Sequence, residues 1–150
     1  MRQSERPVRR RTETPVGLCD ALRMTARAVT AVYDDALRPL GLRVTQFSLL
    51  GRAASLGPVA SQQLSAALGL DKTTLTRNLR PLVRRGLLAI EQGDDRRTRL
   101  VRLTPAGQTL LKDASARWRA VQASFKQRLP EDEFDRILRQ LQRVRAVARH

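Results

Sequence analysis

Apolar residues recur every three or four positions along most of the chain, which is the spacing of one face of an α-helix. The first run follows Thr14 and Pro15, a capping residue and then the residue preferred at the first helical position, and it ends near Pro39. A second run, which we expect Thr45 to cap, ends at Gly57. The pattern therefore predicts a long amphipathic helix followed by a shorter one.

Two short helices joined by a tight turn are predicted next, beginning at Ser61. Gly69 suits the left-handed position that ends a helix, and Asp71 suits the N-cap of the helix that follows. The first of these helices carries an apolar stripe of one leucine and two alanines, and the second is expected to bury three leucines: Leu64, Ala66, Ala67, Leu75, Leu79 and Leu82. Lysine, threonine and arginine side chains then point outward from the second helix. A basic tip of this kind, presented by a helix-turn-helix, is what enters the major groove of DNA.

A hairpin with a charged tip follows, with strands expected over 88–91 and 99–103 and a turn at Gly93, Asp94 and Asp95. Four arginines cluster in this hairpin: Arg96, Arg97, Arg99 and Arg102. An arginine-bearing ribbon beside a recognition helix can reach phosphates or a narrow minor groove. A charged hairpin that is merely solvated is the alternative. The neighbouring helix-turn-helix favours the DNA-binding interpretation.

The C-terminal stretch is predicted to form one helix of about 25 residues after Thr104 and a last helix opened by Pro130. A helix that long spans roughly 37 Å, which is more than a small winged domain needs. A second copy of the chain is the simplest cover for the remaining apolar stripe, and a monomer whose helices fold back on themselves is the alternative. A two-fold pair of recognition helices about 34 Å apart would read a palindromic operator.

The chain resembles the MarR family of bacterial transcription regulators from about Leu18 to its C-terminus. The resemblance rests on the order of the two short helices and on two wing motifs, Asp95-x-Arg97-Thr98 and Leu103-Thr104-Pro105-x-Gly107. It implies a dimer with intertwined terminal helices and a wing in which Arg97 enters the minor groove and Asp95 holds it. Pro81 departs from the pattern, since a proline inside the recognition helix removes an amide hydrogen bond and is expected to kink the helix beyond the DNA-facing turns.

The net charge narrows the choice of partner. The chain of 150 residues has 29 basic and 14 acidic side chains, which gives +15 at neutral pH and a pI near 11.7. Such a charge predicts a polyanionic partner, and nucleic acid is favoured over a membrane surface because no apolar run is long enough to cross a bilayer. With no signal-peptide core after the basic start, we expect a cytoplasmic protein. Residues 1–13 are expected to form a flexible arm, which either attracts phosphates or is a solvated tail.

The chain has few residues that could catalyse a reaction or bind a metal. One cysteine and one C-terminal histidine can build neither a Cys/His metal cluster nor a Ser-His-Asp set, and no phosphate-binding loop is present. We therefore expect no enzyme activity, no metal and no cofactor. A thiol peroxidase using Cys19 is the enzymatic alternative, but it would lack a resolving cysteine and an activating histidine.

Two features are candidates for sensing a signal. Cys19 and Tyr33 resemble the organic-peroxide-sensing branch of the MarR family, in which a tyrosine of the other subunit bonds the thiolate. A second tyrosine of that branch is replaced by Val44 here, and a buried, unreactive cysteine is the alternative. The family also binds small aromatic or anionic effectors between the dimer helices and the winged domain. Trp118 either lines such a site or belongs to the core.

We therefore predict a mainly α fold with a small β-hairpin. It comprises a winged helix-turn-helix over 45–104, a helical dimerisation region over 14–44 and 105–150, and the arm over 1–13. The predicted function is a homodimeric, sequence-specific transcription repressor that a small ligand or oxidation of Cys19 releases from DNA. The alternative is a sequence-indifferent nucleoid-associated protein, which would also be basic and dimeric. The residues expected to contact double-stranded DNA are Lys72, Thr73, Thr76, Arg77, Arg80, Arg84, Asp95, Arg96 and Arg97.

Overall fold

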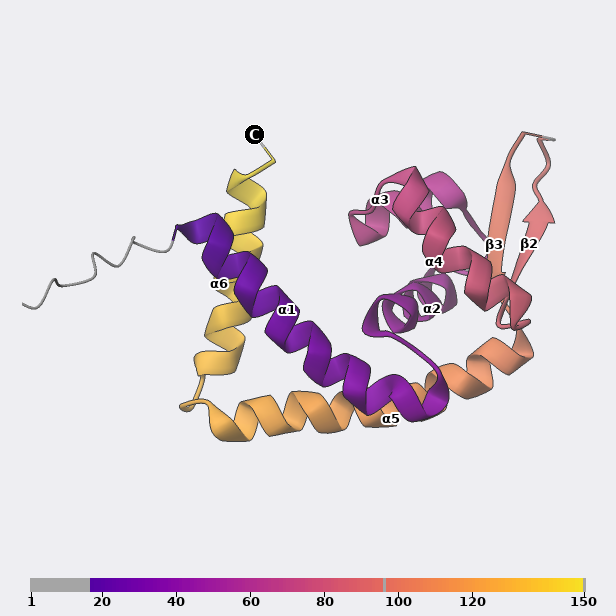
Figure 1. Ribbon diagram of the computed structural model, residues 1–150. Coiled ribbons are helices and arrows are strands. Elements are labelled where there is room, and N and C mark those ends of the chain that lie inside the picture. Colours follow the sequence, from indigo (N-terminus) through magenta and orange to yellow (C-terminus); the bar gives the residue numbers. More distant parts are fainter. Residues whose placement is uncertain (1–16, 96, 150) are drawn as a thin grey trace, which may run out of the picture.

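The computed structural model describes residues 17–95 and 97–149, which form six α-helices, one 3₁₀-helix and three short strands (Figure 1). In chain order these are α1 (Leu18–Leu37), the 3₁₀-helix η1 (Arg38–Leu40), α2 (Val44–Leu56), β1 (Val59–Ala60), α3 (Ser61–Leu68), α4 (Lys72–Arg84), β2 (Leu88–Gln92), β3 (Arg99–Leu103), α5 (Pro105–Arg128) and α6 (Glu133–Val147). The predicted fold class, mainly helical with a small hairpin, is confirmed. Within this described part of the chain, no helix is both long and apolar enough to cross a membrane.

The sheet holds three strands and not the predicted two. β3 lies in the centre, antiparallel to both neighbours, in the order β1-β3-β2. β2 and β3 form the predicted hairpin, with Ile90 opposite Val101. The additional strand, β1, pairs Val59 with Val101 and Ala60 with Leu100. Two residues are too few to show an alternating pattern, which explains why the sequence alone did not predict β1.

The elements from α2 to β3, which we call the winged unit (residues 44–103), pack around a closed apolar core. α4 buries Leu75, Leu79 and Leu82, as predicted. Burying an aliphatic side chain of this size contributes about 1.5–3 kcal/mol. The largest fully buried side chains include one from α1, Leu37, and one from β3, Val101. The full set is Leu37, Leu49, Leu50, Leu64, Leu82, Leu88 and Val101.

The apolar stripe of α3 is buried only in part. Leu64 is fully buried, whereas Ala66 and Ala67 are exposed. The inward face is formed by Leu64 and the partly buried Leu68, one helical turn apart. Alanine is small enough to lie on the solvent side of a helix at little cost, and its position therefore says little about burial.

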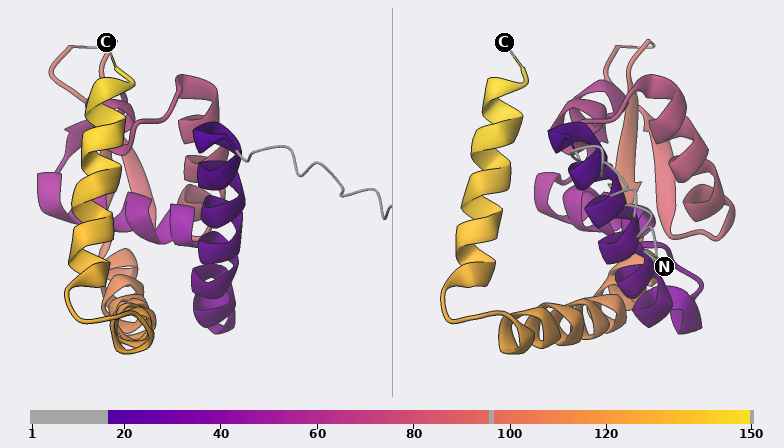
Figure 2. Two further views of the ribbon diagram at one scale, coloured as in Figure 1. Left: turned by 90° about the vertical axis from the view of Figure 1, so that its left-hand side faces the viewer. Right: turned by 60° about the vertical axis from the view of Figure 1, so that its left-hand side comes forward.

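The terminal helices extend away from the winged unit. α5 runs along one edge of the molecule and carries α6 at its far end (Figure 1). In the right-hand view of Figure 2, α6 stands apart from the other helices beyond the end of α5. No residue of α6 is buried, and within α1, all of which is described, Tyr33 and Leu37 alone are buried. The apolar stripes of α1 and α6 are therefore largely exposed to solvent within one chain. We call these two helices the arms, in distinction from the predicted N-terminal arm over 1–13.

The start of α2 differs from the prediction. α2 begins at Val44, so Thr45 is a helical residue and the prediction that it caps this helix is wrong. The first amide of α2 instead donates a hydrogen bond to a side chain of α1. The Val44 N–H donates to Asp34 Oδ1 at 2.7 Å. This carboxylate does the work of a capping side chain although it lies ten residues earlier in the chain.

The last helix also starts later than predicted. α6 begins at Glu133 and not at Pro130, because Asp132 first turns the chain with a φ of 62°. α1 begins at Leu18. Its predicted start signal and the predicted basic arm, both within residues 1–15, lie outside the described residues.

α5 begins as predicted, with Thr104 as the N-cap and Pro105 in the first helical position. Thr104 Oγ1 accepts a hydrogen bond from the Gly107 N–H at 3.0 Å and donates one to the Gly86 carbonyl at 2.6 Å. The Thr104 N–H donates to the Leu87 carbonyl at 3.1 Å. A Cβ on Gly107 would lie 2.1 Å from the Leu87 carbonyl oxygen, so this close approach requires glycine. The start of α5 is thereby fixed to the chain entering β2.

Candidate nucleic-acid interface

α4 begins with a capping arrangement that leaves its tip exposed. The Asp71 carboxylate accepts hydrogen bonds from the Thr74 N–H at 2.8 Å and from the Thr74 hydroxyl at 2.7 Å. These bonds lower the pKa of Asp71, because they favour the charged carboxylate. The Thr76 hydroxyl donates to the Lys72 carbonyl at 2.8 Å. The N-cap predicted at Asp71 is confirmed, and Lys72 and Thr73 stay exposed on the first turn.

The inner face of α4 is attached to the rest of the winged unit by more than its leucines. The half-buried Asn78 donates from Nδ2 to the Thr74 carbonyl at 3.0 Å. Its Oδ1 accepts a hydrogen bond from the Thr45 hydroxyl of α2 at 3.5 Å. Thr45 therefore connects α2 to the recognition helix, which is a different role from the predicted cap.

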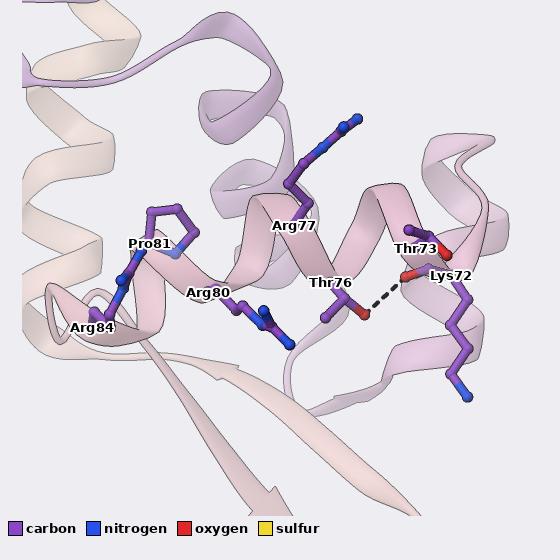
Figure 3. A pocket seen from close by; sticks show the side chains of 7 residues that line it. All are labelled: Lys72, Thr73, Thr76, Arg77, Arg80, Pro81 and Arg84. Carbon is purple, nitrogen blue, oxygen red and sulfur yellow. Dashed lines mark hydrogen bonds between the residues drawn. The ribbon is translucent and has the colours of Figure 1, made fainter.

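The outer face of α4 forms one open groove (Figure 3). Seven side chains line it: Lys72, Thr73, Thr76, Arg77, Arg80, Pro81 and Arg84. Six of these are the residues that the sequence predicts for DNA contact from this helix, so the structure brings that set together on one face. Among these lining residues, four are cations and none is an acid. In Figure 3, Arg77 and Arg80 extend from the helix in different directions, so positive charge is spread across the groove.

Pro81 lies inside α4 without ending it. The helix continues to Arg84, and the Arg85 N–H donates to the Pro81 carbonyl at 3.1 Å. Because proline has no N–H, it cannot donate to the carbonyl of Arg77 one turn earlier. The kink predicted at this position does not interrupt the helix. Pro81 itself lines the groove, between Arg77 and Arg84.

The wing turn is held by backbone bonds and one carboxylate. The Gly93 N–H donates to the Thr98 carbonyl, and the Thr98 N–H donates to the Asp95 carbonyl, both at 2.8 Å. Asp95 Oδ1 accepts a hydrogen bond from the Arg97 backbone N–H at 3.0 Å. Asp95 therefore fixes the backbone of Arg97, and no ion pair between their side chains occurs in the part of the wing that the structure describes. Arg96 lies outside the described residues.

The wing arginines are not equivalent. Nε and Nη2 of Arg102 lie 2.7 and 2.6 Å from Oε1 of Glu91 on the neighbouring strand. The hydrogen bond that Arg102 donates to the Glu91 carboxylate raises the pKa of Arg102. Arg102 is thus engaged within the sheet, whereas Arg97 and Arg99 are exposed. The described members of the predicted four-arginine cluster therefore divide into one structural arginine, Arg102, and two exposed ones nearer the tip, Arg97 and Arg99.

Arg85, just after α4, is absent from the predicted site but makes long-range hydrogen bonds. Its Nη1 donates to the Gly41 carbonyl at 2.7 Å and its Nη2 to the Leu40 carbonyl at 3.1 Å. Helical phase is the one sequence signal that separates it from Arg84. Arg84 lies two turns after Arg77 on the groove face, and the next position is rotated by about 100° away from that face.

The two candidate sensing residues lie in different surroundings. Cys19 is exposed near the start of α1, so the alternative of a buried cysteine does not describe the single chain. Tyr33 is buried and stacks on Phe125 of α5, with ring centroids 6.1 Å apart. Burial raises the pKa of the Tyr33 phenol. Fourteen residues along one helix span about 21 Å, so the two side chains do not meet within one chain.

Trp118 is half-buried and packs against an aromatic residue of another helix. Its ring stacks on Phe47 with centroids 6.0 Å apart and thereby joins α5 to α2. Both interpretations of Trp118, as a core residue and as part of an effector site, stay predictions. Among the described residues, no three histidine, cysteine or acidic side chains come together in a group that could hold a metal ion.

Comparison with known proteins identifies relatives of this fold. Residues 40–98 match the model of the MarR family. A crystal structure of the M. tuberculosis transcriptional regulator MosR in complex with DNA is 34% identical in sequence, with a TM-score of 0.81, over 89% of this chain and 96% of that one. The chain belongs to the MarR family. MarR-family members are transcription regulators and not enzymes, so family membership also confirms the prediction that this chain is not an enzyme.

Two further comparisons cover different shares of the chain. The uncharacterized HTH-type transcriptional regulator YwoH of Bacillus subtilis (strain 168) is 30% identical over 87 residues, which are 58% of this chain and 64%, just under two thirds, of YwoH. The structure of CouR from Rhodococcus jostii RHA1 bound to p-coumaroyl-CoA is 26% identical, with a TM-score of 0.69, over 85% of this chain and 88% of CouR. The resemblance to the peroxide-sensing branch of the MarR family stays a prediction.

Proposed function

We propose that this MarR-family chain is a cytoplasmic, homodimeric repressor that binds a specific operator in double-stranded DNA. The observation that carries the proposal is the outer face of α4, where four cations and two threonines line one groove with no acid among them. Such a groove is complementary to a duplex, because phosphates attract cations and base edges pair with arginine, lysine and hydroxyl groups. The DNA complex of MosR, at 34% identity, supports the same assignment.

The residues proposed to contact DNA have different roles. The N-terminal turns of α4 read bases in the major groove, the C-terminal turns hold phosphates, and the wing tip enters the minor groove. Asp95 acts on the wing tip through the backbone of Arg97, to which it is bonded at 3.0 Å. The proposed residues are, in that order, Lys72, Thr73, Thr76 and Arg77, then Arg80 and Arg84, then Arg96 and Arg97.

A second copy of the chain is the proposed partner of the arms. Exposed large apolar side chains are concentrated on α1 and α6: Leu18, Met24, Val32, Ile137, Leu138, Leu141 and Val147. Contiguous exposed apolar surface of this kind marks interaction sites. A two-fold pair that buries these faces presents two recognition helices to half-sites about one DNA turn, or about 34 Å, apart. The dimerisation region proposed over 14–44 and 105–150 includes both arms.

Selection of bound DNA from a random pool tests the proposal. We expect a palindrome whose affinity exceeds that of bulk DNA by a factor of about 10³ or more. A steep salt dependence without any sequence preference would instead support a nucleoid-associated protein and would refute the repressor.

Release by a small ligand is one proposed signal. The p-coumaroyl-CoA bound to CouR, which combines an aromatic group with an anionic one, supports an effector of that chemistry. Titration of the protein–operator complex with aromatic acids and their coenzyme A thioesters measures this response. Release by at least one of these compounds is expected, and an operator complex insensitive to all of them would argue against this class of effector.

Oxidation of Cys19 is the second proposed signal. The exposure of Cys19 near the start of α1, on a helix proposed to form the dimer, supports it. We expect peroxide to release operator DNA from the wild type and not from a Cys19→Ser protein of equal affinity. If the Cys19→Ser protein responds to peroxide as the wild type does, the thiol is not the sensor.

A further inference from the structure

Two adjacent arginines at the end of α4 have opposite surroundings. Arg84 lines the groove on the outer face. The guanidinium of Arg85 instead reaches back across the chain and donates to the Gly41 carbonyl at 2.7 Å and the Leu40 carbonyl at 3.1 Å. One planar group therefore connects the C-terminal end of the recognition helix to a segment more than forty residues earlier in the sequence.

The carbonyls that Arg85 binds lie in the corner between α1 and α2, residues 38–43. Gly41 turns the chain there with a φ of 65°. On the other side of the corner, Asp34 Oδ1 of α1 accepts a hydrogen bond from the Val44 N–H, the first amide of α2, at 2.7 Å. No residue of α1 before Tyr33 is buried, so within one chain α1 is attached to the winged unit near this corner. A carboxylate thus bonds α1 to the start of α2 just past the corner, and a guanidinium bonds the corner itself to the end of α4.

We propose that Arg85 is a positioning residue that couples α1 to the recognition helix and so sets the distance between the two recognition helices of the dimer. The inference rests on the proposed dimeric DNA-binding function. It assigns to Arg85 a role different from that of Arg84, which lines the groove and is proposed to contact phosphate.

Arg85 can set this distance because its guanidinium makes two hydrogen bonds to the corner at once. Two parallel, charge-assisted hydrogen bonds fix both the distance and the direction between the groups they join. α1 leads to the proposed dimer contact and α4 carries the groove, so the Arg85 bonds fix the groove relative to the dimer. A bivalent protein gains its second half-site only when its geometry matches the spacing of the two sites. Loosening the corner should therefore alter the preferred spacing and not the bases read within each half-site.

Binding of the full-length protein to its selected palindrome tests this role. The same measurement is made on palindromes with one base pair inserted or removed between the half-sites. Arg85→Met should bind the original palindrome about tenfold more weakly and lose most of the preference for its spacing. The base preference within each half-site should not change. Arg85→Lys, which keeps one cationic donor, should recover part of the spacing preference.

Arg84→Met is the matched control, because it removes the neighbouring charge without touching the corner. It should weaken binding equally at every spacing and reduce the slope of log affinity against log salt by about one. Arg85→Met behaving in this same way, or keeping the full spacing preference of the wild type, overturns the inference. Circular dichroism and sedimentation establish that each variant is folded and dimeric, and Arg85→Lys carries the comparison if Arg85→Met does not fold. A wild type without a palindromic preference refutes the proposed function itself, which is a distinguishable result.

Discussion

The winged unit and the arms are built from the same kind of amphipathic helix, yet their leucines lie in opposite surroundings. Leu82 of α4 is 0% exposed, whereas Leu138 of α6 is 46% exposed. Both residues belong to runs of apolar positions spaced by three and four. Periodicity therefore tells which face of a helix is apolar, but it does not tell whether the same chain covers that face.

The difference has a thermodynamic consequence. A face covered within one chain contributes to folding at any protein concentration. A face covered by a second copy contributes only as far as the copies associate, so its effect on stability depends on concentration. The winged unit and the arms should respond differently to equivalent substitutions.

The largest effect is expected for Leu82→Ala. Truncating a fully buried leucine removes apolar contacts and leaves a cavity, which costs about 2–5 kcal/mol of folding free energy. Chemical denaturation at two protein concentrations should give the same loss. Leu138→Ala is the control in the arm, and its loss should change with concentration. Equal, concentration-independent losses for both would show that one chain covers α6 by itself.

Paired charges in the arm should separate the dimer without unfolding the winged unit. Leu138→Glu combined with Leu141→Glu places two carboxylates on the open apolar face of α6. Sedimentation should show monomers, and operator affinity should fall about 10²-fold or more because the second half-site is lost. Circular dichroism should show that the helices of the winged unit remain. A dimer that persists with both charges would place the subunit contact elsewhere.

At the wing, Arg97→Ala should weaken operator binding by about 1–3 kcal/mol, because it removes an exposed cation from the proposed minor-groove contact. Arg102→Ala is the matched control, since that guanidinium is already bonded to Glu91. Its effect on affinity should be smaller. Equal effects, measured by titration with operator DNA at one salt concentration, would contradict the division between structural and DNA-facing wing arginines.

The smallest effect is expected for Asp71→Ala, which removes the N-cap of α4. The pKa of Asp71 is lowered in the folded protein by its bonds to Thr74, below an ordinary value of 3.8. The carboxylate therefore stabilises the fold above that ordinary value, and the contribution disappears as the pH falls through the lowered pKa. The melting temperature of Asp71→Ala should lie a few degrees below wild type at neutral pH, and the difference should shrink below about pH 4. A difference that persists at lower pH would exclude the charged cap as its cause.

The sequence predicted those features of the fold that depend on bonds between residues close together in the chain. Gly69 and Asp71, at the end of one helix and the start of the next, act through bonds within a few residues, and both predictions are confirmed. The cap at Thr45 was wrong because Asp34, from another helix, bonds the first amide of α2. β1 was missed because its two residues form a strand only by pairing with β3.

The candidate site, like the fold, was predicted where the cause was local and missed where it was long-range. Helical phase placed the predicted α4 residues on one face, and Figure 3 shows them lining a single groove. The engagement of Arg102 by Glu91 depends on the register of β2 against β3, which the sequence pattern does not specify. Arg85 was missed because its acceptors lie in a corner of the chain whose position depends on the whole fold.

The contact at Gly107 ties the start of α5 to the base of the wing. A Cβ at this position would lie 2.1 Å from the Leu87 carbonyl oxygen, so either the first turn of α5 or the chain that enters β2 would have to move. Thr104 bonds the same two segments together, because its hydroxyl donates to the Gly86 carbonyl and its N–H donates to the Leu87 carbonyl. A side chain at position 107 would therefore change how the hairpin is set against α5, although the residue lies outside the groove on α4.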